Sequence, residues 1–462
     1  MTDFCERIPA GVYQQMEAIF ADRLSMNKDI REQHSHGEDY HTPGCPEVVC
    51  YAQTTDEVSQ LLRLCNQHRI PVVPFGVGTS VEGHVVATRG GVSLDLSLMT
   101  QILEINQLDM DARIECGVTR QQLNQDLRDS GLFFSVDPGA EATIGGMVAT
   151  RASGTNTVRY GTIRENVLGL TLVMANGDII KTGTRARKSA AGYDLTRLIV
   201  GSEGTLAVVT EIQIRLHPQP ESICAAVSQF DTLKGAVDTV IEVLQHAVPM
   251  ARIELLDAVQ MDACIKYSSL DGYLAAPTLF MEFHGTEASV VEQANLVEQI
   301  AKEQGASNFK FARLEEDRNR LWKARHAAYY AGCALAPGSR GLTTDVCVPL
   351  SSLVESIETT RLEIEQSGLI ATILGHVGDG NYHVLILIDP EDSDQLAKAQ
   401  ILGEGIVQRA LACGGTCTGE HGIGIGKREY LRQEEGQGVE MMRLIKTALD
   451  PNGILNPDKI FE

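Results

Sequence analysis

Two histidines stand seven residues apart in one glycine-rich stretch, Gly375–His383, which reads G-H-V-G-D-G-N-Y-H. An odd spacing puts two residues on opposite faces of a regular strand, but G-D-G-N breaks the alternation and lets His376 and His383 point at one spot. Glu420, in the later run G-E-H-G-I-G, adds a carboxylate. Two imidazoles and a carboxylate leave an open coordination position, which is typical of a catalytic metal site. From the residues alone, hydrogen-bonded polar side chains in a glycine turn explain the pattern equally well.

Composition excludes several classes of protein for this chain of 462 residues. Its net charge of −22 and 5% aromatic content argue against a nucleic-acid binder, which needs a basic face and stacking platforms. The sequence contains no run of eighteen apolar residues, so a membrane span is not expected. The 11 scattered cysteines fit free thiols in a reducing compartment, and the first residues resemble no targeting signal. We therefore expect a cytoplasmic protein, with peripheral attachment at the inner membrane left open.

Short apolar strands, helices and glycine turns alternate from residue 47 and predict a nucleotide-binding α+β domain. The run H-P-Q-P-E at 217–221 is typical of a linker, and long helical stretches alternate with strands beyond it. We predict a first domain at 1–220, a substrate or cap domain at 221–412, and a C-terminal segment at 413–462 that returns to the first. Three histidines of the turn at 32–44 (His34, His36 and His41) are expected to be surface polar residues.

Four glycine loops lie within about 130 residues of the first domain. The first holds Gly76, Gly78 and Gly83 with Thr79 and Ser80; the others are centred on Gly145–Gly146, Ser153–Gly154 and Gly201–Gly204. Glycines let backbone N–H groups approach phosphate oxygens, and a hydroxyl adds a hydrogen bond. The first loop alone fits neither G-x-G-x-x-G nor a Walker loop and is equally readable as a plain turn. Four loops together favour a long dinucleotide lying across the domain.

In these glycine loops and in the histidine-containing stretches, the sequence resembles the vanillyl-alcohol-oxidase superfamily. The runs P-F-G-V-G-T-S, D-P-G-A-E-A-T-I-G-G-M-V-A-T, Y-G-T-I-R-E-N-V-L-G-L and G-S-E-G-T-L-A-V-V-T-E-I resemble its FAD-binding domain. The later runs G-H-V-G-D-G-N-Y-H and G-E-H-G-I-G-I-G-K resemble the C-terminal part of its D-2-hydroxy acid dehydrogenases. The resemblance covers roughly residues 40–460 in order. It implies an α+β fold with a two-subdomain FAD-binding domain at 1–220 and a cap domain whose antiparallel sheet is covered by helices.

The resemblance further implies FAD, with its pyrophosphate over the loop 76–80 and its flavin near residues 137–161 and 201–212. His84 ends the first loop, but the R-x-G-G-H-type run of relatives with covalent FAD is absent, so non-covalent FAD is expected. The positions that match cofactor-binding ones are Pro74, Gly76, Gly78, Thr79, Ser80, Asp137, Pro138, Gly139, Thr143, Gly145, Gly146, Ser153, Gly154, Tyr160, Gly161, Glu203, Gly204, Val209 and Ile212.

For the chemistry, the resemblance assigns roles to five residues. His376, His383 and Glu420 match ligands of a divalent metal; zinc is the first expectation, with manganese, cobalt or iron as alternatives. Arg325 matches the residue that clamps the substrate carboxylate, and a guanidinium suits this because it meets both oxygens. His421 matches the base that takes the hydroxyl proton, as an imidazole can near neutral pH. The hydrogen on the α-carbon would then leave as hydride to flavin N5.

Departures from one branch of the family favour a monocarboxylate substrate. D-2-hydroxyglutarate dehydrogenases hold the distal carboxylate with a lysine and an asparagine at positions where this chain has Thr343 and Leu385. Losing both contacts leaves a second carboxylate poorly satisfied, at a cost of a few kcal/mol. We therefore expect oxidation of D-lactate, or a similar small D-2-hydroxy monocarboxylate, to the 2-oxo acid.

Other readings stay open at this stage. A glycolate-oxidase-type flavin subunit would carry the same site but need partner subunits, and D-2-hydroxyglutarate dehydrogenase is a further alternative. An ether-lipid synthase or a flavin protein that only carries electrons fits the G-D-G-N-Y-H and G-E-H-G runs less well. No NAD fingerprint is present, so the electron acceptor is expected to be a cytochrome, a quinone or an electron-transferring flavoprotein. A homodimer is compatible with the sequence, and no nucleic-acid partner is expected.

Overall fold

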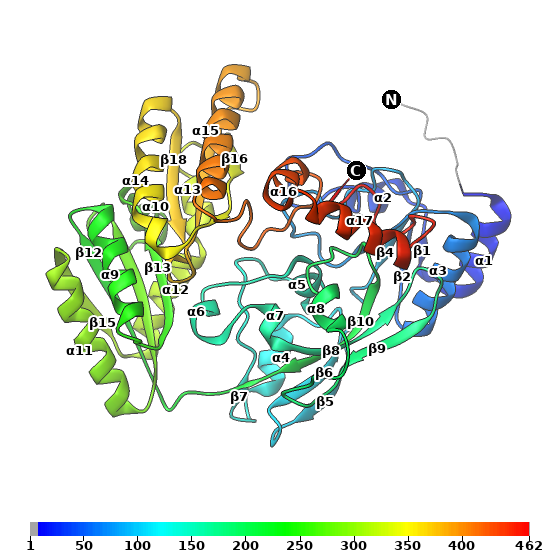
Figure 1. The fold of residues 1–462 in the computed structure, drawn as a ribbon, viewed down its shortest axis with the longest axis horizontal. Coiled ribbons are helices and arrows are strands. Elements are labelled where there is room, and N and C mark those ends of the chain that lie inside the picture. The colour runs from blue at the N-terminus through cyan, green and yellow to red at the C-terminus, as the bar shows by residue number, and fades with distance from the viewer. Residues whose placement is uncertain (1–7, 462) are drawn as a thin grey trace. The chain divides into compact units, whose positions relative to one another are not determined.

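The computed structural model describes residues 8–461, and its internal contacts divide these into two units. Unit 1 comprises residues 8–153, 161–219 and 420–461, and unit 2 comprises residues 154–160 and 220–419. The chain therefore passes between the units at four points, and the last return to unit 1 comes directly after Gly419. Figure 1 shows the elements of both units coloured along the chain.

The first sheet of unit 1 has the strand order β1-β2-β4-β3. Its strands are β1 (Leu24–Ser25), β2 (Val48–Tyr51), β3 (Val72–Phe75) and β4 (Val92–Asp95), and β2, β4 and β3 run parallel. Helix α3 (Thr55–His68) connects β2 to β3. It begins where the Thr54 hydroxyl accepts a hydrogen bond from the Glu57 N–H and buries the apolar stripe Val58, Leu61, Leu62 and Cys65. The predicted β-α-β start is thus confirmed.

The second sheet of unit 1 is antiparallel, with the order β5-β6-β10-β8-β9. Its strands are β5 (Ile102–Asn106), β6 (Asp111–Glu115), β8 (Val167–Val173), β9 (Ile179–Gly183) and β10 (Val208–Arg215). A small pair joins β7 (Leu132–Phe133) to β11 (His217–Pro218). The helices of unit 1 are α1 (Ala10–Phe20), α2 (Lys28–Gln33), α4 (Arg120–Leu127), α5 (Ile144–Thr150), α7 (Ile163–Asn166), α8 (Leu195–Ile199), α16 (Arg428–Glu435) and α17 (Gly438–Leu449), with a 3₁₀ turn at Ala21–Arg23.

Unit 2 is built on one eight-stranded antiparallel sheet with the order β15-β12-β14-β13-β18-β19-β16, and β17 also pairs with β19. Its strands are β12 (Ser222–Phe230), β13 (Met250–Leu256), β14 (Thr278–Gly285), β15 (Ala306–Ala312), β16 (Arg340–Thr343), β17 (Val346–Cys347), β18 (Ile370–Gly375) and β19 (Asn381–Ile388). Helices cover both faces, as the prediction of a helix-covered antiparallel sheet requires.

One face of this sheet packs against α9 (Leu233–Gln245), α11 (Glu287–Glu303), α14 (Leu350–Ser367) and α15 (Ser393–Ala412) (Figure 1). The other packs against α10 (Ala258–Ser268), α12 (Glu315–His326) and α13 (Ala328–Cys333). The short helix α6 (Thr157–Tyr160) lies against β13. Side chains alternate between the faces, so Tyr382 reaches Ser356 of α14 while Thr372 reaches Gln260 of α10.

Several local expectations were wrong. His34 is buried, with Nε2 2.9 Å from Asp95 Oδ2, so it is not a surface residue. In the second half of the chain, where long helices and strands were expected to alternate, residues 340–347 form two short strands, β16 and β17, separated by Thr344 and Asp345, and residues 315–333 form two helices that meet at Ala327. The C-terminal segment, for which no helix was expected, contains α16 and α17.

The turn between β18 and β19 is closed by a glycine that no other residue replaces well. Gly380 has φ +79°, the left-handed region, and donates its N–H to Val377 O at 3.2 Å. A Cβ there would collide with the carbonyl oxygen of Val348. The turn can therefore reverse tightly enough to return His383 to the level of Leu374, its partner in the register.

Changing Gly380 to Ala should destabilise the folded chain by about 1–3 kcal/mol, because a Cβ meets both the strained φ and the Val348 carbonyl. The midpoint of thermal unfolding measures this. The control is Gly403→Ala inside α15, where a Cβ meets only Thr344 Cγ2 at 3.7 Å and helix propensity favours alanine. An unfolding midpoint for Gly380→Ala equal to that of the control would contradict the turn geometry.

Candidate active site

Two imidazoles come together at the end of the β18–β19 hairpin. His376 follows β18 directly and His383 lies within β19, and their ring centroids are 5.6 Å apart with the planes at 86°. Both residues belong to unit 2, and the G-D-G-N turn between them provides the change of direction. The pair presents two nitrogen ligands at one place on the sheet.

A buried carboxylate that the sequence analysis did not consider orients the first imidazole. Glu254, on β13, is 1% exposed, and its Oε1 accepts from His376 Nδ1 at 2.8 Å. Its Oε2 accepts from Arg325 Nη2 at 2.6 Å. Burial acts to raise the pKa of Glu254, but His376 and Arg325 outweigh it and hold the pKa below its usual value. The carboxylate is therefore ionised and accepts from both partners.

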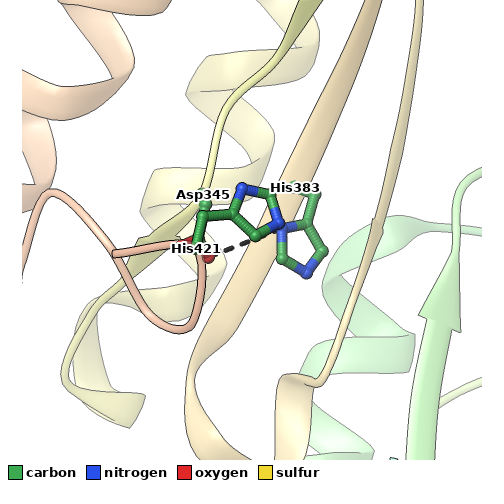
Figure 2. Close-up of side chains that lie close together, drawn as sticks. All are labelled: Asp345, His383 and His421. Atoms are coloured by element: carbon green, nitrogen blue, oxygen red, sulfur yellow. Dashed lines mark ion pairs between the residues drawn. The ribbon is translucent and has the colours of Figure 1, made fainter. Parts of the chain in front are cut away.

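Asp345 occupies the corresponding place beside the second imidazole, as Figure 2 shows. Its Oδ1 lies 3.5 Å from His383 Nδ1, and the carboxylate is fully buried. Asn381 donates to Oδ1 at 2.8 Å and the Thr418 hydroxyl donates to Oδ2 at 2.8 Å. Asp345 lies at the break between β16 and β17, which turns its side chain toward β19. In both histidines a carboxylate faces Nδ1, which leaves Nε2 as the nitrogen turned away from it.

Glu420 and His421 follow the last residue of unit 2 along the chain. Gly419 packs so closely against Asn381 and Asp345 that a Cβ would lie 3.1 Å from Asp345 Oδ1. Within unit 1, the Ser153 hydroxyl donates to Glu420 Oε2 at 2.6 Å.

Arg325 lies in the last turn of α12 and is 7% exposed. Besides the bond to Glu254, its Nε is shielded from solvent and has no hydrogen-bond partner among residues 8–461. A buried guanidinium with an unpaired N–H is costly unless an acceptor reaches it. The arrangement therefore suits the binding of a small anion such as a carboxylate.

The predicted cofactor loops meet through their glycines in unit 1. A Cβ on Gly76 would lie 2.7 Å from Thr143 Oγ1, and one on Gly204 would lie 3.1 Å from Pro74 Cγ. Thr143 caps α5 by accepting from the Gly146 N–H at 3.2 Å. The first, second and fourth loops can approach one another only because these positions lack side chains.

The third loop and Tyr160 lie at a crossing between units. Ser153 ends one segment of unit 1, while Gly154 and Tyr160 bound the short segment that belongs to unit 2. There the Tyr160 hydroxyl is 2.7 Å from His284 Nδ1. In unit 1, Val209 and Ile212 of β10 pack in or against the core, and Ile212 is fully buried.

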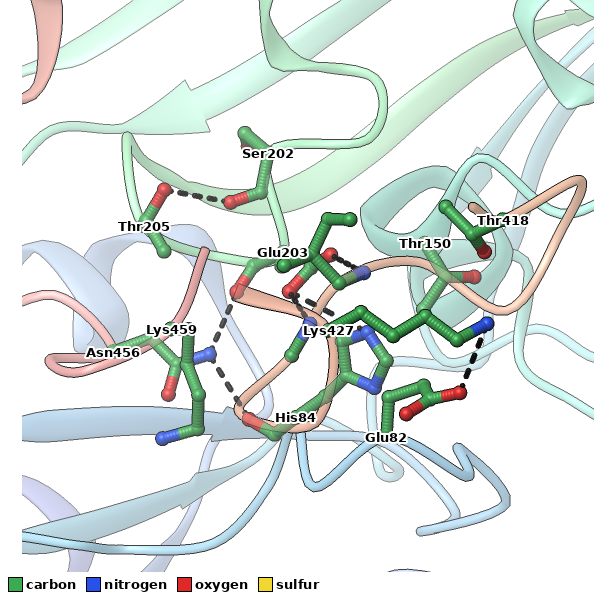
Figure 3. Close-up of polar contacts among 12 residues, drawn as sticks. Glu82, His84, Thr150, Ser202, Glu203, Thr205, Thr418, Lys427, Asn456 and Lys459 are labelled. Carbon is green, nitrogen blue, oxygen red and sulfur yellow. Dashed lines mark hydrogen bonds and ion pairs between the residues drawn. The ribbon is translucent and has the colours of Figure 1, made fainter. Parts of the chain in front are cut away.

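Glu203, predicted among the cofactor positions, has both carboxylate oxygens on the segment that follows His421. Its oxygens accept from the N–H groups of Ile423 at 2.7 Å and Gly424 at 2.8 Å, and His84 Nε2 lies 3.4 Å away (Figure 3). Burial acts to raise the pKa of Glu203, but His84 and the two N–H groups hold it below its usual value. A Cβ on Gly422 would lie 2.8 Å from both side chains of the pair.

Further buried polar contacts hold the same region of unit 1. Lys427 Nζ lies 3.1 Å from Glu82 Oε1, and the Asn456 amide donates to the carbonyl oxygens of His84 and Glu203 (Figure 3). His84 is thus held on both its ring and its backbone. Sequence reasoning had weighed His84 only for covalent FAD; its place beside Glu203 had no signal in the local sequence.

Thr343 and Leu385, the two positions at which this chain departs from the dicarboxylate branch, are direct neighbours. Thr343 of β16 pairs with Leu385 of β19, and Leu385 pairs on its other side with Thr372 of β18. Leu385 is fully buried, and its methyl groups lie against Gly332 and Gly341. Leu385 also shares a sheet face with His383, two residues earlier.

Comparison with known proteins gives two family matches. Residues 46–183 match the "FAD binding domain" family, and residues 219–460 match "FAD linked oxidases, C-terminal domain". A solved structure of p-cresol methylhydroxylase with substrate bound aligns with a TM-score of 0.81 over 98% of this chain and 97% of that chain, at 18% identity. That likeness concerns the fold, and it confirms the predicted FAD-binding fold with a C-terminal cap domain.

Curated relatives are similar over most of their length. The chain is 48% identical to a protein of Danio rerio named probable mitochondrial D-lactate dehydrogenase (95% of this chain, 89% of that one). It is 45% identical to an Arabidopsis thaliana protein named mitochondrial D-lactate dehydrogenase [cytochrome] (98% and 81%). It is 34% identical to the glycolate oxidase subunit GlcD of Bacillus subtilis (90% and 89%).

The names of these relatives correct one expectation. A cytoplasmic location, with peripheral attachment at the inner membrane left open, was expected, and this is wrong: the Danio rerio and Arabidopsis thaliana relatives are named as mitochondrial proteins. Within residues 8–461, none of the helices combines the length and the apolar character that crossing a membrane requires.

Changing Glu203 to Gln should lower stability by about 1–3 kcal/mol. The amide group places a donor against a backbone N–H and removes the counter-charge of buried His84. The thermal unfolding midpoint should fall, whereas Glu17→Gln, an exposed change in α1, should leave it unchanged. Equal midpoints for the two variants would show that the Glu203 bonds contribute nothing to the fold.

Proposed function

This chain belongs to the family of FAD-linked oxidases, and on that premise we propose that it oxidises D-lactate, or a similar small D-2-hydroxy monocarboxylate, to the 2-oxo acid with a divalent metal ion at its site. Membership of the family makes it an FAD-linked oxidoreductase, as the sequence motifs had implied. The observation that carries the proposal is the buried carboxylate of Glu254, which joins an imidazole to a guanidinium on one sheet face.

The first loop of unit 1 fits the phosphates of FAD. Ser80 Oγ is shielded from solvent and has no hydrogen-bond partner within residues 8–461, and a phosphate oxygen would supply one. Gly78 has φ +71°, and its Cα faces the Phe75 ring closely enough that a Cβ would lie 2.9 Å away. FAD, when bound, supplies the hydride acceptor. The chain's part is to hold it without covalent attachment, since the one histidine of this loop pairs with Glu203.

The proposal of a metal ion rests on the types of ligand atom that the chain offers. We propose His376 and His383 as nitrogen ligands through Nε2 and Glu420 as the oxygen ligand, with an open position for the substrate. Two observations support the histidines: the ring centroids are 5.6 Å apart, and a carboxylate faces Nδ1 of each ring. Glu420 is supported by its position in the sequence, directly after Gly419. A divalent ion held there, zinc first, supplies a Lewis acid for the substrate hydroxyl.

We assign the remaining chemistry to Arg325 and His421. Arg325 binds the substrate carboxylate, and its buried Nε without a protein acceptor supports this. His421 takes the hydroxyl proton, and its position next to Glu420 along the chain supports that role. By this proposal residues 1–220 hold FAD, residues 221–412 bind the substrate, and the segment 413–462 carries Glu420 and His421 back to the FAD-binding part.

The acceptor of the electrons is proposed to be a cytochrome, because the Arabidopsis thaliana relative is named as a cytochrome-type enzyme. A quinone or an electron-transferring flavoprotein are the alternatives, and a homodimer is the proposed assembly. The second candidate function is a glycolate-oxidase-type flavin subunit, which the 34% identity to GlcD supports. D-2-hydroxyglutarate is disfavoured because Leu385 stands where the distal carboxylate would need a polar partner.

Anaerobic mixing with substrates tests the proposal directly. FAD-loaded protein is mixed in turn with D-lactate, L-lactate, glycolate and D-2-hydroxyglutarate, and the visible absorbance of oxidised flavin is followed before and after treatment with a chelator. D-lactate should bleach the flavin quickly, and the chelator should abolish this until metal is restored. Faster bleaching by glycolate would move the assignment to the second candidate, and bleaching after complete metal removal would contradict the metal site.

A double substitution tests the substrate class. Thr343→Lys with Leu385→Asn should raise kcat/KM for D-2-hydroxyglutarate relative to D-lactate by roughly 10–200-fold, since it adds polar partners for a second carboxylate. Steady-state kinetics with both acids measure the ratio. The control is Thr278→Val on the same sheet, remote from β19 in the strand order. An unchanged ratio in the double variant would show that this part of the sheet does not contact the substrate.

A further inference from the structure

We propose that Glu254 is a positioning residue that couples the two halves of the site: through one carboxylate it fixes both the metal-ligating ring of His376 and the substrate-binding guanidinium of Arg325. This inference rests on the proposed function and adds a residue to it. Glu254 touches neither substrate nor metal, and it acts through its two partners.

The geometry of the carboxylate commits one oxygen to each partner. Oε1 accepts from His376 Nδ1 at 2.8 Å, and Oε2 accepts from Arg325 Nη2 at 2.6 Å. Because Arg325 can only donate, the carboxylate acts as the acceptor in this arrangement, and His376 facing it carries its proton on Nδ1 and turns a lone pair on Nε2 outward. The carboxylate thereby selects the tautomer that binds a metal and fixes the plane of the ring.

The sheet register holds Glu254 at the required place. Leu255, its neighbour on β13, pairs in antiparallel register with Gly375, the last residue of β18, so His376 follows on the side of Glu254. The side chains of Leu255 point to the opposite sheet face, which leaves Glu254 on the face of α12. Glu254 is 1% exposed, so water does not compete for its oxygens.

A second contact fixes α12 to the same strand. Arg252, two residues before Glu254, places its guanidinium 4.6 Å from the ring centre of Trp322, three residues before Arg325. Residues i and i+2 of a strand and i and i+3 of a helix share a face, so the two contacts lie side by side. Both contacts join α12 to β13, but only the bond from Arg325 reaches the carboxylate that orients His376.

A matched carboxylate on the next strand provides the control. Glu282 of β14 is 5% exposed, its Oε1 lies 2.8 Å from His284 Nε2, and Arg252 Nε lies 3.6 Å away. It therefore has the same kinds of partner as Glu254 but contacts neither His376 nor Arg325. Loss of its charge reports what removing any buried carboxylate from this sheet does.

The experiment compares Glu254→Gln, Glu254→Asp and Glu282→Gln with the unchanged protein. Two readouts are used: the dissociation constant of zinc from competition with a chromophoric chelator, and the separate kcat and KM for D-lactate. We expect Glu254→Gln to weaken zinc binding by about 10–100-fold and to raise KM. Glu254→Asp keeps the charge but is one methylene shorter, so its carboxylate should reach only one of the two partners. One readout, either the zinc dissociation constant or KM, should then equal that of the unchanged protein, and the other should not. Glu282→Gln should leave the zinc dissociation constant unchanged.

The outcomes separate this inference from the proposed function. If the unchanged protein neither binds zinc nor accepts electrons from D-lactate, the proposed function fails, and the role of Glu254 fails with it. If the unchanged protein does both but Glu254→Gln has the same zinc affinity and KM, only the coupling role is overturned. An equal loss of zinc affinity in Glu282→Gln would show a general effect of removing buried charge, which also overturns it.

Discussion

A single carboxylate in the interior of unit 2 has both oxygens committed to charged or polar side chains, and the candidate site depends on it. Glu254 lies between His376 and Arg325 with 1% of its surface exposed. Removing one partner of a buried ion pair leaves an uncompensated charge and costs about 3–5 kcal/mol, so none of the three can change alone without a large effect. The sheet provides the required rigidity, because β13 and β18 fix the backbones from which two of the three side chains project.

Unit 1 contains a second buried carboxylate, Glu203, that also fixes part of the candidate site, but through different partners. Glu203 accepts from the backbone N–H groups of Ile423 and Gly424, whereas Glu254 accepts only from side chains. Hydrogen bonds to backbone N–H groups suit a glycine-rich segment, because it has few side chains that could form contacts and loses much conformational entropy on folding. Gly422 has φ +81° and leaves no room for a Cβ beside the Glu203 carboxylate. The conformation of the segment after His421 therefore depends both on the absence of a side chain at Gly422 and on the hydrogen bonds to Glu203.

The sequence indicated the parts of this protein whose chemistry is local. The glycine loops, the G-D-G-N turn and the helix stripe of α3 are each contained in one short run, so the sequence could locate them, although their proposed roles came from the family resemblance. Glu254 and Asp345 could not be found in this way, since each meets its histidine across strands that are far apart along the chain. A retrospective signal existed for Glu254: the run M-A-R-I-E-L-L alternates charged and apolar residues within an otherwise buried strand. A charged residue at such a position needs a partner.

The net charge of −22 opposes the approach of an organic anion, the class of substrate proposed for this protein. Distance resolves the difficulty. At physiological ionic strength the Debye length is about 8 Å, so exposed carboxylates beyond that distance act weakly on a substrate inside the site. There Arg325 supplies the cation: it is 7% exposed, and its Nε has no hydrogen-bond partner among residues 8–461. The same surface charge favours encounter with a basic partner protein at longer range. The acidity of the chain is thus compatible with an anionic substrate and better suited to a basic electron acceptor than to an acidic one.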